Sequence, residues 1–116
     1  MIAEFDNELG KVMISKEAIA KIAGLTAMDC YGVVGMASKN MKEGIVKLLG
    51  LDMLETGVEV NIEENELFLT LHIIVSYGTN ISAIGESIQS TVKYKVEQLS
   101  CIKVADVKIV VEGIRV

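Results

Sequence analysis

The chain has 116 residues, 51% of them hydrophobic, and its 16 acidic and 11 basic side chains give a net charge of -5. This length fits a single domain whose core needs no disulfide or metal. The acidic balance argues against a nucleic-acid binder that neutralises phosphates with clustered Lys and Arg. High apolar content argues against disorder, and the three Tyr and two Phe are too few for a base-stacking platform.

Compartment and domain limits follow from the chain's start and its cysteines. No apolar stretch approaches the roughly 18 residues that a membrane span requires, and the acidic start is unlike a secretory signal. Cys30 and Cys101 lie far apart without CxxC spacing, which predicts two buried free thiols in a reducing compartment. We therefore expect a cytoplasmic protein with a polar lead-in over residues 1–9 and a single domain over residues 10–116.

The first half of the domain predicts a strand, a helix and a second strand. Val12–Ile14 forms a short strand, and Ser15 is a good N-cap for a helix that runs from Lys16 to about Asp29. One face of that helix is apolar: Ala18, Ile19, Ile22, Ala23 and Leu25. Gly32 ends this segment, and Val33–Ala37 reads as a short buried strand.

A further amphipathic helix is predicted over residues 40–54, where Met41, Ile45, Leu48 and Leu49 share one stripe. Gly44 weakens that helix by about 1 kcal/mol relative to Ala.

The second half predicts a hairpin, a long helix and a final strand. Val58–Ile62 alternates apolar and polar residues, turns at Glu63–Asn65 and returns as Leu67–Tyr77. The returning strand has one dry face and a mixed face that carries Phe68, Thr70, His72, Ile74 and Ser76.

After Gly78, Thr79 or Asn80 caps a helix whose apolar stripe is Ile81, Ile84, Ile88, Val92, Val96 and Leu99. Residues 101–116 form the last strand. The order β-α-β-(α)-β-β-α-β predicts an α+β two-layer sandwich with a mixed sheet and about two main helices.

Reactive side chains are scarce. A thiol enzyme would need Cys30 or Cys101 beside His72, the one histidine of the chain. Both cysteines stand beside apolar residues, where packing explains them. Three scattered Cys and His residues supply no zinc site, and the acidic turn at Glu63–Glu66 lacks the rhythm of a calcium loop. We expect no catalytic residue, metal or cofactor.

Two glycine motifs have structural explanations. Gly32 and Gly35 match the GxxG spacing of nucleic-acid-binding KH modules, but that loop joins two helices and presents basic residues. Here two valines fill it, which favours a turn into a buried strand. Gly78, Thr79 and Asn80 precede a helix N-terminus that could hold an anion. A turn and a cap account for these residues as well.

Two surfaces are candidates for contact with a partner. The segment over residues 40–54 carries more large apolar residues than one helical face can bury, and the surplus indicates an interface. The mixed face of the returning strand is the second candidate. The predicted interface residues are Met41, Ile45, Leu48, Leu49, Leu51, Phe68, His72 and Ile74. The last strand, if it lies at a sheet edge, could pair with another chain.

Five stretches of the sequence resemble a known family. Matching stretches are GKVMISKEAIAKIAG at Gly10–Gly24, CYGVVGMASKN at Cys30–Asn40 and HIIVSYGTNI at His72–Ile81, followed by IQSTVKYKVEQL at Ile88–Leu99 and VADVKIVVEGIRV at Val104–Val116. They resemble the alkaline shock protein, or envelope stress response, family of Gram-positive bacteria, and within it the short single-domain YloU-like branch. YGVVGMASKN together with VSYGTNI is the specific combination.

This resemblance implies a small α+β domain without established catalytic residues or cofactor, associated with cell-envelope homeostasis. It implies a protein partner, either a membrane protein that holds some members at the cytoplasmic membrane face or a neighbour of the fatty-acid kinase type, which would link the domain to lipid metabolism. One departure concerns Leu51–Glu55, where the family leads us to expect a more polar, basic stretch.

We therefore predict a non-enzymatic scaffold or regulator that acts by protein–protein contact and self-associates. The alternatives are a KH-like nucleic-acid binder and a small thiol enzyme.

Overall fold

The computed structural model describes residues 2–7, 10–38 and 56–115. The helix predicted over residues 40–54 therefore lies outside the described residues. The elements are β1 Ile2–Asn7, β2 Gly10–Ser15, α1 Lys16–Met28, β3 Val33–Met36, β4 Val58–Glu63, β5 Glu66–Ser76, α2 Ile81–Ser100 and β6 Val104–Arg115.

Strand β5 is the centre of a four-stranded sheet. Along one edge it pairs in parallel with β6, from Leu67 to Ser76. Its other edge is shared by two antiparallel strands that follow one another, β4 against residues 66–71 and β3 against residues 73–75. The sheet is mixed, as predicted, and β5 has partners along both edges.

The hairpin turn joins β4 to β5 over two residues. Glu64 and Asn65 both have positive φ, +50° and +63°, and Glu63 pairs with Glu66 across the turn. Two left-handed residues in a two-residue loop match the right-handed twist of the flanking strands. The predicted turn is confirmed, and it fixes which β5 side chains face the helices.

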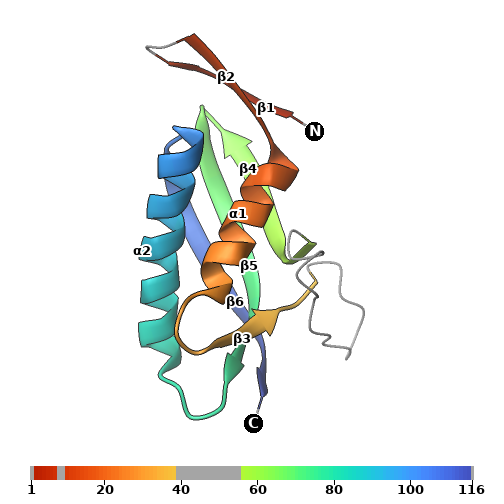
Figure 1. Ribbon diagram of the computed structural model, residues 1–116, viewed down its shortest axis with the longest axis vertical. Helices are drawn as coiled ribbons and strands as arrows, with labels where there is room; N and C mark the ends of the chain where they lie inside the picture. Colours follow the sequence, from red (N-terminus) through yellow and green to blue (C-terminus); the bar gives the residue numbers. More distant parts are fainter. Residues whose placement is uncertain (1, 8–9, 39–55, 116) are drawn as a thin grey trace.

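Both helices cover the same face of the sheet (Figure 1). The predicted dry face of β5 is confirmed, because Leu67, Leu69, Leu71, Ile73 and Val75 are fully buried. On α2 the middle of the apolar stripe is buried, at Ile84, Ile88, Val92 and Val96. These side chains join Ile19, Ala23 and Ala27 of α1 in one core. The result is the expected α+β sandwich of one helix layer on one sheet.

The helix starts are capped by side chains. Ser15 Oγ accepts a hydrogen bond from the Ala18 amide at 3.0 Å. Asn80 Oδ1 accepts one from the Ala83 amide at 3.1 Å. Of the two residues predicted to cap α2, Asn80 is the cap, and the Thr79 hydroxyl instead donates to the Ser76 carbonyl at 2.6 Å.

The N-terminal residues contain a strand that the sequence did not predict. Strand β1 pairs antiparallel with β2 from Ile2 opposite Ser15 to Asn7 opposite Gly10. This two-stranded sheet is separate from the four-stranded one and lies at one end of the molecule (Figure 1). Val12–Ile14 is thus a strand, as predicted, but it lies outside the main sheet.

Several apolar residues assigned to buried faces are exposed. Leu25 on α1 and the two ends of the α2 stripe, Ile81 and Leu99, have large exposed fractions. Tyr77 follows the last residue of β5 and is exposed as well. Periodicity assigned these residues to the correct helix or strand, but only the residues that also pack against another layer are buried, as Ile84 to Val96 are on α2.

Gly32 and Gly78 both adopt positive φ, +87° and +85°, and differ in their surroundings. A Cβ at Gly32 would come within 2.9 Å of Ile84 Cγ1 and closer still to its Cδ1, whereas a Cβ at Gly78 meets no atom within 4 Å. The predicted turn role therefore fits both positions. Gly35 differs, since it lies inside β3, where the pairing with β5 shifts between Val33 and Gly35.

This contrast supports a matched pair of variants. Gly78→Ala should lower the free energy of unfolding by about 1 kcal/mol, the usual cost of a left-handed alanine. Gly32→Ala should cost about 1–3 kcal/mol more, because the new methyl group overpacks against Ile84. Urea denaturation followed by circular dichroism measures both. Equal losses for the two variants would contradict the packing role of Gly32.

Candidate interaction surfaces

The face of the sheet opposite the helices carries the predicted mixed surface. We call it the outer sheet face; β5 contributes Phe68, Thr70 and His72 to it, all partly exposed. Their neighbours on β6 are Asp106, Lys108 and Val110, in that order. The surface is a partly exposed aromatic ring among charged and polar side chains.

His72 is held by carboxylates from both neighbouring strands. Its Nδ1 lies 2.8 Å from Glu112 Oε1 on β6, and its Nε2 lies 3.9 Å from Glu59 Oε2 on β4. Glu112 reaches the histidine because side chains alternate along β6, so Glu112 lies on the same face as Val110, the residue paired with His72. The pairing shifts directly after this contact, with Ile73 opposite Val111 and Ile74 opposite Gly113, which is a β-bulge.

This arrangement orients the imidazole and does not expose it for chemistry. The Nε2 atom is buried and has no hydrogen-bond partner among the described residues. A general base must reach the proton that it removes from a substrate, and a buried Nε2 does not. The pair of His72 and Glu112 therefore links β5 to β6 on the outer sheet face and has a structural role there.

The cysteines lie in other parts of the fold. Cys30 is in the core on the helix side of β5, whereas His72 points to the opposite face. Burial raises the pKa of the Cys30 thiol, a hydrogen bond with Thr91 lowers it in part, and the Asp29 carboxylate raises it. Cys30 is thus kept as a thiol, which is a poor nucleophile.

Cys101 corrects the prediction that both thiols are buried, because it is exposed. It ends α2 in the left-handed conformation, with φ +60°, so its side chain leaves the apolar stripe of the helix. It precedes β6 by three residues, while His72 pairs with Val110 six residues into that strand. At about 3.3 Å per strand residue, that separation rules out a direct thiol–imidazole pair.

The predicted interface residues fall into three groups. Phe68 and His72 lie together on the outer sheet face. Ile74 belongs to the same strand but is 0% exposed, so a partner would reach this face through the other two. Met41, Ile45, Leu48, Leu49 and Leu51 lie outside the described residues.

The two glycine motifs behave as structural elements. The GxxG stretch runs from the turn at Gly32 directly into β3, so it does not join two helices and the KH interpretation does not fit. At the start of α2, the amide of Ala83 is already bonded to Asn80. In the acidic turn, Glu66 pairs with Lys103 at 3.2 Å. Among the described residues, no three His, Cys, Asp or Glu side chains could hold a metal ion.

A groove between the two helices is a surface that the sequence analysis missed. Its volume is about 460 Å³, and it is lined by Thr26, Asp29, Cys30, Tyr31, Ser87, Thr91, Tyr94 and Lys95. Tyr31 is 86% exposed and Tyr94 65% exposed, and the third tyrosine, Tyr77, is 72% exposed. None of the three tyrosines of the chain is therefore in the core, and no pattern in the sequence marked them as exposed.

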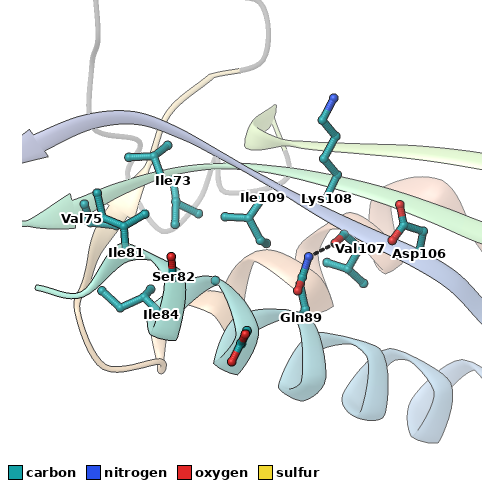
Figure 2. A pocket seen from close by; sticks show the side chains of 13 residues that line it. Ile73, Val75, Ile81, Ser82, Ile84, Gln89, Asp106, Val107, Lys108 and Ile109 are labelled. Carbon is teal, nitrogen blue, oxygen red and sulfur yellow. Dashed lines mark hydrogen bonds between the residues drawn. The ribbon is translucent and has the colours of Figure 1, made fainter.

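A second groove runs between α2 and β6 (Figure 2). Its volume is about 400 Å³, and its floor is apolar, with Ile73, Val107, Ile109 and Val111 from the sheet and Ile81 and Ile84 from the helix. The Gln89 side chain crosses it and donates a hydrogen bond to the Val107 carbonyl at 2.8 Å. That carbonyl therefore points away from β5, towards the outer edge of β6.

Comparison with known proteins decides the family. The model of the alkaline shock protein family, described as having a cell envelope-related function, matches residues 4–116. The chain belongs to the alkaline shock protein family. This is the family that the sequence motifs resemble.

The relatives include proteins of similar length. YloU of Bacillus subtilis (strain 168) is 44% identical over 117 residues, which is 100% of this chain and 98% of YloU. Spy1614 of Streptococcus pyogenes serotype M6 is 30% identical, over 100% of this chain and 97% of the relative. A stress response regulator Gls24 homologue of Streptococcus pyogenes serotype M3 is 26% identical over 91% of this chain, but that match spans 59% of the regulator.

Solved structures show a similar fold. A variant of the MamM C-terminal domain in its zinc form aligns with a TM-score of 0.52 and 12% identity, over 86% of this chain and 87% of that one. At this identity the likeness concerns the fold alone. Within the described residues, no helix is long and apolar enough to span a membrane.

The two cysteines should differ in reactivity. In the folded protein, a thiol reagent such as DTNB should label Cys101 quickly and leave Cys30 unlabelled, because burial both shields Cys30 and raises its pKa. Cys101→Ser should abolish the fast phase, and urea should release the slow one. Rapid labelling of Cys30 in the native state would contradict its placement in the core.

Proposed function

We propose that this member of the alkaline shock protein family is a non-enzymatic scaffold or regulator that acts by protein–protein contact in cell-envelope homeostasis. The observation that carries the proposal is the exposure of all three tyrosines, two of which, Tyr31 and Tyr94, line the groove between the helices. Tyrosine is enriched at protein interfaces because it offers a large contact area and a polar hydroxyl at low entropic cost. The three exposed rings are therefore available for contact with a partner.

The chemistry of the remaining surface agrees with this role. The histidine is shielded, one thiol is buried, and the other caps a helix. The groove between the helices combines aromatic rings with the opposite charges of Asp29 and Lys95 at its edges. An interface with an apolar centre and a charged rim has this composition.

The partner classes follow from the family. We propose either a membrane-anchored protein, which would hold the domain at the inner face of the cytoplasmic membrane, or an enzyme of the fatty-acid kinase type, which would link it to lipid metabolism. The name of the Gls24 relatives, stress response regulators, supports a regulatory role. We also propose that the chain self-associates.

Affinity purification from the native cell tests the proposal. The tagged wild-type chain should recover one discrete envelope or lipid-enzyme partner in near-stoichiometric amount. Tyr31→Ala with Tyr94→Ala should reduce that recovery by about tenfold or more, since interfacial tyrosines are frequent hot spots. Tyr77→Ala is the matched control, because it removes an equally exposed tyrosine that does not line the groove.

Two outcomes would overturn the proposal. One is recovery of no discrete protein by the wild-type chain. The other is unchanged recovery by the double variant, provided that circular dichroism shows the variant to be folded. Phe68→Ser then asks whether the outer sheet face carries the contact instead.

A further inference from the structure

Among the described strands, β6 lies at the edge of the four-stranded sheet. It pairs with β5, and none of the other described strands pairs with its opposite edge. An edge of 12 residues presents a row of backbone groups that can template another strand. Side chains of α2 already bind two backbone groups on the first half of β6, since Glu97 accepts from the Val104 amide and Gln89 donates to the Val107 carbonyl. Beyond them, Ile109–Val111 is an uncharged stretch between Lys108 and Glu112 and precedes the bulge at Gly113. This stretch is the part of the edge that is open to pairing.

The geometry identifies which backbone groups face outwards. Val107 points its carbonyl to the outer edge, where Gln89 binds it. Pairing with β5 is regular from Val107 through Ile109 to Val111, and backbone groups alternate in direction along a strand. Ile109 and Val111 therefore also direct their N–H and C=O groups outwards.

We propose that a second copy of this chain pairs antiparallel with this edge, about a two-fold axis through Val110. In that register Ile109 lies opposite Val111 of the second copy, and Val111 opposite Ile109. Each of these pairs exchanges two backbone hydrogen bonds. The two sheets become one continuous sheet with all four helices on the same side.

Charge complementarity selects this register. With the axis at Val110, Lys108 lies opposite Glu112 of the second copy, and the symmetry repeats the pair. An axis at Ile109 would place Asp106 opposite Glu112, and an axis at Lys108 would place two lysines together. Like charges directly opposite one another destabilise a sheet.

The side chains of the edge fit the same arrangement. Ile109, Val110 and Val111 are all partly exposed, so pairing would bury them. Ile109 and Val111 also line the apolar groove beneath α2 (Figure 2). The corresponding side chains of the second copy would extend that apolar floor. One symmetric contact thus covers the free edge and the adjoining part of the groove.

This inference deepens the proposed function, because it names a second copy as one partner and assigns it to a surface separate from the groove between the helices. The wild-type chain should sediment as a dimer in analytical ultracentrifugation. Lys108→Glu and Glu112→Lys should each weaken the dimer by at least about tenfold, since each creates two like-charge pairs. Lys21→Glu, an exposed charge reversal on α1, is the matched control and should leave the dimer unchanged.

Two combinations make the test specific to this register. The double variant Lys108→Glu with Glu112→Lys should dimerise again. An equimolar mixture of the two single variants should form a heterodimer, because one chain carries two acids where the other carries two lysines. The double variant, like Glu112→Lys alone, lacks the hydrogen bond between His72 and Glu112. If it dimerises, loss of that bond is not what weakens the dimer in the single variant.

A wild-type monomer at all accessible concentrations would overturn the inference, and so would a dimer that is insensitive to every charge reversal. Failure of the double variant and of the mixture to restore the dimer would overturn the register. Partner recovery through Tyr31 and Tyr94 is measured separately. A monomer that still binds its partner therefore removes the dimer alone, and a dimer that binds no partner removes the proposed function alone.

Discussion

Strand β5 is bonded along both edges and has one face that is wholly removed from water. β3, β4 and β6 all take their positions from it, and both helices pack on the five side chains of its buried face. Because β5 has strand partners along both edges, the unpaired backbone edge on this side of the sheet belongs to β6. The same strand points Phe68 and His72 to the opposite face. It therefore contributes to the core and to the outer sheet face, and it positions the β6 edge.

Much of this arrangement could be predicted from the sequence. Alternation from Leu67 to Val75 identifies a half-buried strand, and the spacing from Ile84 to Val96 identifies the helix that covers it. Both patterns are strong because burial imposes them at every second or every third to fourth position. Single polar residues were equally informative where their hydrogen bond is to a nearby residue, as with Ser15, which caps α1 by bonding to the Ala18 amide.

The rest depends on contacts between distant segments. The contact between Glu112 and His72 requires the register of β6 against β5, which no local pattern in β6 encodes. The groove between the helices requires the packing of α1 on α2, which alone brings Tyr31 near Tyr94. The β1 strand was missed because its alternation covers only Ala3 to Asp6, a run too short to stand out in an acidic N-terminal segment. Local sequence patterns thus predict the helices and strands of this protein, whereas its surfaces depend on how distant segments pack together.

The central claim is that the protein acts by binding other proteins through its surface, and that the β6 edge binds a second copy of the chain about a two-fold axis. Hydrogen–deuterium exchange of the Ile109 and Val111 amides, measured over a range of protein concentrations, tests it most directly. The account predicts fast exchange in dilute solution, where both amides face water, and strong protection as the dimer forms. Exchange that stays fast at both amides in a solution shown by sedimentation to be dimeric would contradict it.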